Sequence, residues 1–99
     1  MKHLFTVCDR TSLQLALYLG EQVERLMPTW RFEIVWVETN EPPPLVNYPI
    51  IPLFERLPTL HSWVDTYSSP ELPYVLRPMT AQFILGQNPN IEQLVFLAP

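Results

Sequence analysis

Proline is the residue that most constrains how this chain can fold. The 99 residues include twelve prolines and only two glycines, against a usual proline share of about 5%. The prolines begin at Pro28, so the first quarter of the chain has none. Because proline lacks a backbone N–H and restricts the residue before it, residues 41–52 are not expected to form a helix or a central strand. We therefore predict a proline-rich, extended connection over residues 42–58.

The proline-free start predicts a βαβ unit within residues 1–41. Residues 4–8 are almost wholly apolar, which is typical of a strand buried on both faces. Apolar residues then recur at helical spacing until Pro28 ends the helix. Residues 31–39 are rich in β-branched and aromatic residues and indicate a second strand. Strand, helix and strand in about 35 residues predict a crossover with a parallel pair.

The rest of the chain completes a single small α/β domain with a mostly parallel sheet. Residues 59–99 are predicted to form its second half, which ends in an apolar strand over residues 94–98. Cys8 is the only cysteine, so neither an internal disulfide nor a cysteine-built zinc site is expected. The two histidines are far apart in the sequence, with no acidic cluster beside them, and we predict no metal.

Charge and hydropathy narrow the classes of partner. Six basic residues are scattered along a chain of net charge -4. Because phosphate binding needs a clustered basic face, no nucleic-acid partner is expected. No apolar run approaches the roughly 20 residues of a membrane span, and no secretory signal opens the chain. We expect no membrane association and, by default, a cytoplasmic location.

The junction after the first strand holds the clearest candidate site. Ligands of open parallel sheets bind beyond the carboxyl ends of the strands, where Arg10 and Ser12 follow the first strand. A helix start offers free backbone N–H groups, and arginine adds a forked donor for a carboxylate or phosphate. One interpretation is an anion site at Arg10 and Ser12. The other is that Ser12 only caps the helix and Arg10 is a solvated loop cation.

Four short motifs follow one another along the chain: DRTS at 9–12, EIV at 33–35 leading to Thr39, HSWVD at 61–65 and ELP at 71–73. Their order, and the spacing from Pro28 to Thr39, resemble the first domain of the porphobilinogen deaminases (hydroxymethylbilane synthases). The chain departs from that family in several places. Val64 stands where the family has a lysine, the Gly-Gly-Lys-Gly loop is absent, and the chain is about one third of the family's length.

The resemblance implies a shortened protein of tetrapyrrole (porphyrin) biosynthesis that binds or polymerises porphobilinogen, a carboxylated pyrrole. If the chain is an enzyme, the resemblance implies a transferase. By the matching motifs, Arg10, Ser12, Thr39 and Ser62 would bind substrate, and Asp65 would be the catalytic carboxylate that stabilises positive charge beside the pyrrole nitrogens. Dipyrromethane is implied only as the family's cofactor, and this chain is not expected to attach it.

Two alternatives stay open beside the deaminase interpretation. A thioredoxin-like domain would place Pro73, as a cis-proline, beside Cys8, whereas the deaminase interpretation requires Asp65 to face Arg10. The second alternative is a small α/β binding or interaction module without catalysis. Its apolar strand over residues 94–98 would pair with a protein partner or with another copy of the chain.

Overall fold

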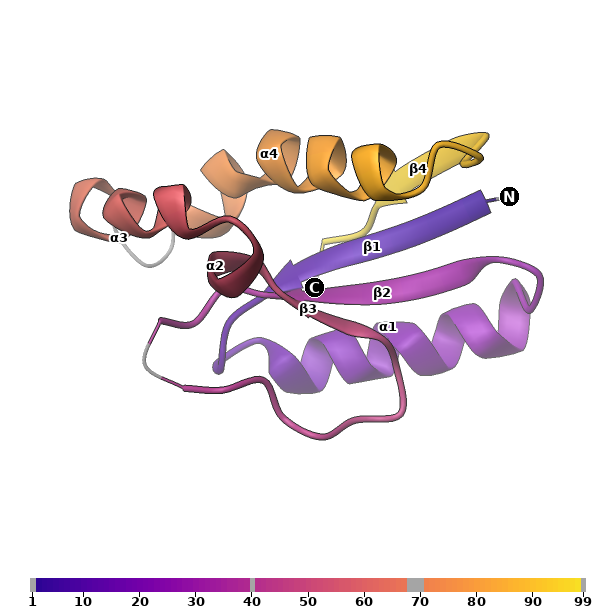
Figure 1. The fold of residues 1–99 in the computed structure, drawn as a ribbon. Helices are drawn as coiled ribbons and strands as arrows, with labels where there is room; N and C mark the ends of the chain where they lie inside the picture. The colour runs from indigo at the N-terminus through magenta and orange to yellow at the C-terminus, as the bar shows by residue number, and fades with distance from the viewer. Residues whose placement is uncertain (1, 40, 68–70, 99) are drawn as a thin grey trace.

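The fold starts from a strand, a helix and a second strand that the sequence predicts. The computed structural model describes residues 2–39, 41–67 and 71–98. It contains β1 (Lys2–Cys8), α1 (Leu13–Leu26) and β2 (Arg31–Trp36) (Figure 1). β1 and β2 are parallel, with His3 opposite Arg31 and Cys8 opposite Trp36. The apolar residues of both strands are buried, as expected for a strand covered on both faces.

The sheet has four parallel strands in the order β3-β2-β1-β4. β3 (Ile50–Pro52) pairs with β2, and β4 (Gln93–Phe96) pairs with the other side of β1. The strand order therefore reverses at β1. The predicted α/β class with a parallel sheet is confirmed, and the apolar stretch near residue 94 is one of its strands. The radius of gyration is 13.0 Å, which is typical of one domain of about 100 residues.

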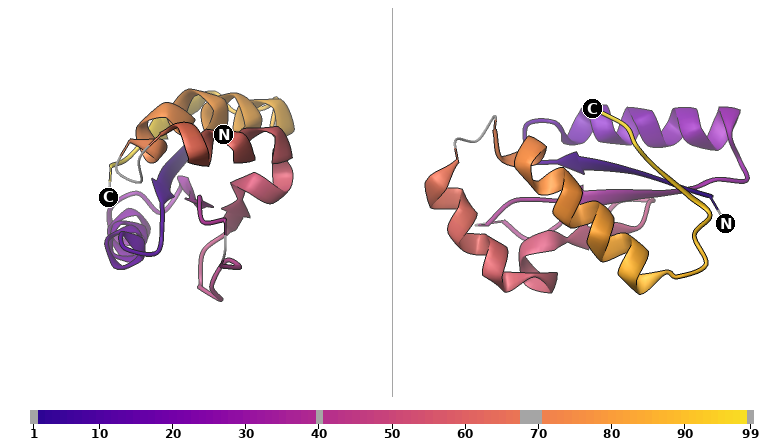
Figure 2. Two further views of the ribbon diagram at one scale, coloured as in Figure 1. Left: turned by 90° about the vertical axis from the view of Figure 1, so that its left-hand side faces the viewer. Right: turned by 90° about the horizontal axis from the view of Figure 1, so that it is seen from above.

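Helices cover both faces of the sheet, as Figures 1 and 2 show. α1 packs on one face, where alternate residues of β1 such as Leu4 and Cys8 meet Ala16 and Val23. On the other face lie α2 (Leu53–Arg56), the 3₁₀ helix η1 (Pro58–Ser62), α3 (Trp63–Thr66) and α4 (Leu72–Gln87). Each face of the sheet thus has its own hydrophobic cluster. The same strands contribute to both clusters because successive side chains of a strand point to opposite faces.

The proline-rich stretch contains regular structure that its composition did not predict. Both β3 and α2 lie within residues 42–58. β3 is a short edge strand ending at Pro52, where the missing N–H deprives no neighbouring strand of a bond. Pro73 lies in the first turn of α4, and the described residues contain no cis peptide bond. The cis-proline of the thioredoxin-like interpretation is therefore not found.

The loop between β2 and β3 is held against α1 by Tyr48. Its ring lies so close to Gly20 that a Cβ added there would come within 2.7 Å of Tyr48 Cζ. The same ring makes an edge contact with Phe32, with centroids 5.7 Å apart. Desolvation raises the pKa of the Tyr48 hydroxyl, and Glu24 and Glu21 raise it further. A glycine on α1 thus fixes the path of the proline-rich loop.

A buried polar cluster lies on the α4 face of the sheet. Glu33 on β2 is 6% exposed, and His3 on β1 is 1% exposed. Glu33 Oε1 lies 3.3 Å from His3 Nδ1 and 3.3 Å from Arg31 Nε. Desolvation lowers the pKa of His3; Glu33 opposes this shift, while Arg31 and the amino terminus add to it.

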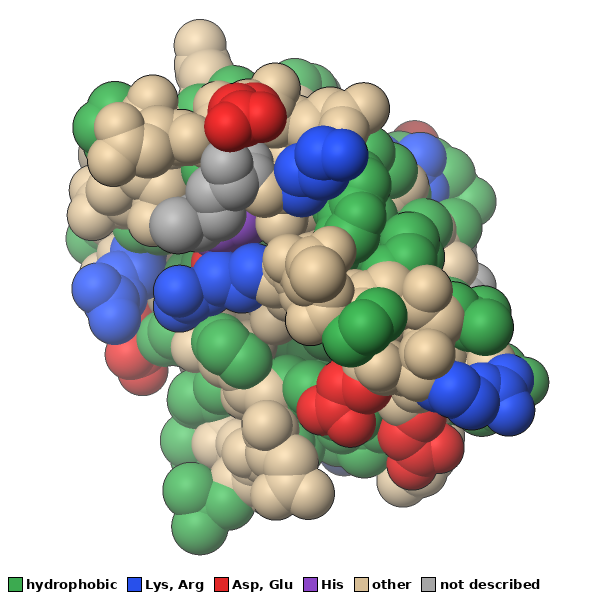
Figure 3. Space-filling view, turned by 90° about the vertical axis from the view of Figure 1, so that its right-hand side faces the viewer, with side chains coloured by type: hydrophobic (Ala, Val, Ile, Leu, Met, Phe, Trp, Pro, Cys, Tyr) green, Lys and Arg blue, Asp and Glu red, His purple; other side chains and the backbone are tan. Residues whose placement is uncertain are grey.

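One side of the molecule lies at the amino ends of the strands. On this side, the basic residues are not concentrated as they are on a face that binds nucleic acid. There, Lys and Arg side chains lie dispersed among acidic and apolar ones (Figure 3). In the part of the chain that the structure describes, no helix has the length and hydropathy needed to cross a membrane.

Candidate functional site

A pocket of about 360 Å³ opens at the carboxyl ends of β2 and β3. This is the end of a parallel sheet at which ligands bind in open α/β folds. The loop after β2, the end of β3, and the helices α2 and η1 supply its walls. The lining residues are Trp36, Glu38, Thr39, Glu41, Pro42, Pro43, Pro52, Phe54, Glu55 and His61.

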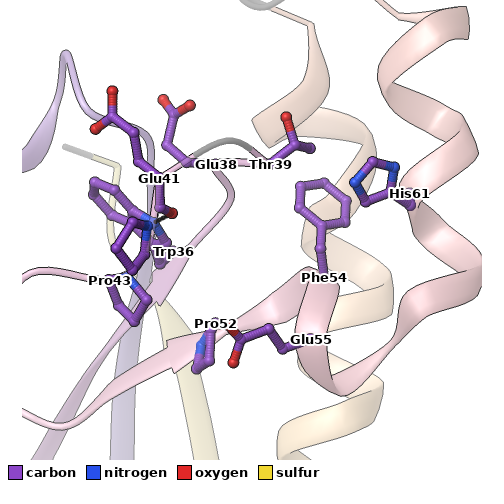
Figure 4. A pocket seen from close by; sticks show the side chains of 10 residues that line it. Trp36, Glu38, Thr39, Glu41, Pro43, Pro52, Phe54, Glu55 and His61 are labelled. Atoms are coloured by element: carbon purple, nitrogen blue, oxygen red, sulfur yellow. Dashed lines mark hydrogen bonds between the residues drawn. The ribbon is translucent and has the colours of Figure 1, made fainter.

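The pocket is acidic and has aromatic walls. Three of its lining residues are glutamates, and none is lysine or arginine. Trp36 and Pro43 lie across the pocket from Phe54 and His61 (Figure 4). The Phe54 and His61 rings meet at an angle of 64° with centroids 5.6 Å apart. One wall is therefore fixed by a ring contact, and carboxylates supply the charge.

Two of the glutamates are held in place by hydrogen bonds. Trp36 Nε1 donates to the Glu41 carbonyl oxygen at 3.0 Å. The backbone N–H of Arg10 donates to Glu38 Oε1 at 2.9 Å, and Arg10 Nη1 donates to Glu41 Oε1 at 2.8 Å. These bonds tie the β1–α1 loop to the loop after β2.

Arg10 does not line this pocket, but its side chain pairs with the lining residue Glu41. Its side chain is 70% exposed, and that of Glu41 is 40% exposed. Exposed ion pairs of this kind contribute roughly 0 to 1 kcal/mol, so an anionic ligand could replace Glu41 at little cost. Arg10 is therefore an exposed loop cation that also pairs with an acidic side chain.

The start of α1 already holds a carboxylate, that of Asp9. Asp9 Oδ1 accepts bonds from the backbone N–H groups of Thr11 at 3.0 Å and Ser12 at 3.1 Å, and from both hydroxyls. Burial raises the pKa of the Asp9 carboxyl, but these hydrogen bonds together outweigh burial and hold it below its usual value. The side chain of Ser12 makes no capping bond to α1. Its hydroxyl serves the Asp9 turn.

One of the remaining predicted site residues lines the pocket, and two do not. Thr39 lines the pocket. Ser62 is in η1, where its hydroxyl donates to the Thr59 carbonyl oxygen at 3.4 Å. Asp65 is in α3. Within residues 2–39, 41–67 and 71–98, Asp65 and Arg10 form no ion pair with each other, and the substrate and catalytic roles of these residues stay predictions.

Cys8 has the environment of an unreactive core thiol. The side chain is fully buried at the end of β1. Desolvation, followed by the charges of Asp9 and Glu38, raises the pKa of the thiol to about 12. Thiolate chemistry needs the opposite shift. No group of three or more metal-ligating side chains is found among the described residues.

The sequence interpretation missed the pocket glutamates and His61. Glu38 and Glu41 follow β2 just as Asp9 and Arg10 follow β1, so the rule that selected Arg10 also applies to them. Glu55 and His61 carry no such signal, because the helices that bring them to the pocket lie in the proline-rich region and after it. Comparisons of the chain with protein families, with characterised proteins and with solved structures found no match. The resemblance to porphobilinogen deaminases therefore stays a prediction.

Proposed function

We propose that this domain binds a small organic cation, such as an amine, in the pocket at the carboxyl ends of β2 and β3. The observation that carries the proposal is the lining itself: three glutamates, the aromatic rings of Trp36 and Phe54, and no lysine or arginine. This proposal places the chain in the class of small α/β binding modules.

Size and chemistry both support an amine as ligand. A volume of about 360 Å³ falls at the small end of ligand pockets, which span roughly 300 to 1,000 Å³. A cation there gains Coulomb attraction from Glu38 and Glu55, and a weaker attraction from Glu41, which already pairs with Arg10. The faces of Trp36 and Phe54 add cation–π attraction of about 0.5 to 2 kcal/mol where the cation is desolvated.

A second candidate function is porphobilinogen binding, which the resemblance implies. Porphobilinogen carries an aminomethyl group as well as two carboxylates. The pocket glutamates would bind the ammonium, and the exposed side chain of Arg10 would exchange Glu41 for a substrate carboxylate. Asp65, Ser62 and the transferase reaction belong to this second candidate alone.

The test is calorimetric titration with phenethylamine and with 2-phenylethanol, which has the same shape without the charge. We expect saturable binding of the amine only. Glu55→Gln should weaken it by about two- to fivefold, because one carboxylate partner is lost. Glu24→Gln, which makes the same charge change at an exposed position of α1 outside the pocket, is the matched control.

Two outcomes would refute the amine proposal: equal binding of the alcohol, or equal weakening by Glu55→Gln and Glu24→Gln. A parallel titration with porphobilinogen tests the second candidate. Binding that Arg10→Ala weakens, while phenethylamine binding is unchanged, would support it. No porphobilinogen binding in a protein that binds phenethylamine would remove it.

A further inference from the structure

The two edges of the sheet differ in how they are protected. β3 is three residues long, ends at Pro52 and follows Pro49. Short strands and prolines are the usual protection of an edge against pairing with another chain. β4 contains no proline and no charged residue. Among the described residues, only β1 pairs with it.

Among the described residues, two residues of β4 direct their backbone N–H and C=O groups away from β1. Leu97 N–H donates to the Phe5 carbonyl oxygen at 2.9 Å, next to the parallel β1–β4 pair. Because the N–H groups of a strand alternate between its two sides, those of Leu94 and Phe96 point away from β1. The outer edge of β4 therefore offers two amides and two carbonyls to a further strand.

The flank of α4 beside this edge is also uncovered. α4 and β4 run side by side in opposite directions (Figure 2, right). Tyr74 is 64% exposed and Leu85 is 44% exposed. Eleven residues are three turns of a helix, so these two side chains lie on the same side of α4. Arg77, on that side as well, stacks on Tyr74 and on Phe96 of β4.

Arg77 is a cation without an anion in the part of the chain that the structure describes. Its guanidinium carbon lies 4.2 Å from the Tyr74 ring centroid and 4.0 Å from that of Phe96. Its Nε is buried and has no hydrogen-bond acceptor. A half-buried guanidinium held beside two rings is well placed to receive a carboxylate.

We propose that a second copy of this chain pairs with β4 in the antiparallel direction, giving a continuous eight-stranded sheet with two-fold symmetry. The outward amides allow a register in which Leu94 lies opposite Leu94 of the second copy. Glu92 then lies opposite Phe96 of the second copy, on which that copy's Arg77 stacks. The symmetry repeats this contact, so two Glu92–Arg77 pairs form at one interface.

The opposite charges of Glu92 and Arg77 favour a second copy of the chain as the partner of β4. Residues directly opposite each other on antiparallel strands have Cβ atoms about 5 Å apart. Glu92 is the residue directly before β4, so continuing this pairing by one residue would bring its carboxylate to the guanidinium. In the same arrangement, the exposed flanks of α4 that carry Tyr74 and Leu85 turn toward each other. The interface extends the fold and is separate from the proposed amine pocket, which lies beyond β2 and β3.

The test is sedimentation velocity of the purified chain over a range of concentrations. We expect a monomer–dimer equilibrium. Arg77→Glu and Glu92→Arg should each raise the dimer dissociation constant by roughly tenfold or more, because like charges then face each other. The double variant should restore association. Leu85→Asp should also weaken the dimer, whereas Leu45→Asp, an exposed leucine far from α4 in the loop before β3, should not.

Hydrogen exchange gives a readout that does not depend on a variant. The amides of Leu94 and Phe96 should become protected as the protein concentration rises, whereas the amide of Leu97 should exchange equally at all concentrations. A chain that stays monomeric at near-millimolar concentration would overturn the proposal. So would a dimer in which the charge reversals have no effect, or one in which the Leu94 and Phe96 amides remain unprotected.

Discussion

Gly20→Ala sets two effects of opposite sign against each other at the contact between α1 and Tyr48. An alanine in the interior of a helix is favoured over glycine by about 1 kcal/mol. The added Cβ, however, would come within 2.7 Å of Tyr48 Cζ and 2.8 Å of Cε2. Overpacking of this kind costs about 1 to 3 kcal/mol. We therefore expect Gly20→Ala to lower the free energy of unfolding by about 0 to 2 kcal/mol.

The same substitution should change sign when the ring is removed. In a Tyr48→Ala background no ring opposes the Cβ, so Gly20→Ala should raise the free energy of unfolding by about 1 kcal/mol. The coupling energy between the two positions is then about 1 to 3 kcal/mol. Urea unfolding followed by tryptophan fluorescence measures all four free energies by linear extrapolation.

Gly86 provides the matched control for this cycle. It lies in α4, and a Cβ added there would meet nothing within 4 Å. Gly86→Ala should stabilise the protein by up to about 1 kcal/mol in both backgrounds, because only helix propensity changes. The reasoning fails if Gly20→Ala stabilises the protein equally with and without the Tyr48 ring, since the ring would then not occupy the space beside Gly20.

Three further predictions concern titratable groups. The pKa of His3 is lowered from 6.5 in the fold. As the pH drops below about 6.5, the His3 side chain therefore takes up a proton in the unfolded chain before it does so in the folded one, and stability should fall. His3→Gln should flatten the dependence of the unfolding free energy on pH in this window, and an unchanged slope would contradict the assignment. Asp9→Ala should lower the unfolding free energy at pH 7 by about 0.5 to 3 kcal/mol, because it removes the charged acceptor of the hydrogen bonds in the turn before α1. This difference should shrink as the pH falls below 3.8, the unfolded pKa of Asp9, because its folded pKa is lower. Equal wild-type and variant stabilities at pH 7 would refute this role of Asp9. The thiol of Cys8, with its pKa raised to about 12, should react with a disulfide reagent at pH 8 only after denaturation, and rapid labelling of the native protein would show that it is not buried.

Local pattern was sufficient for the elements near the amino terminus. The apolar run before Asp9, the helical spacing up to Pro28 and the β-branched run after it specify the βαβ unit by short-range rules. The same rules found the apolar strand near Leu94. They failed for β3 and α2, because composition rich in proline excludes a central strand but not a short strand at the edge of a sheet.

The sequence by itself determined which residues stand at the carboxyl ends of the strands, since that depends on where each strand stops. It did not determine what they contact. Arg10 pairs with a carboxylate 31 residues away, and the route of the β2–β3 loop that carries this carboxylate depends on Tyr48 resting on Gly20. The pocket, its acidic charge and the open edge of β4 were decided by the tertiary structure, because each is a property of segments brought together by packing across the sheet.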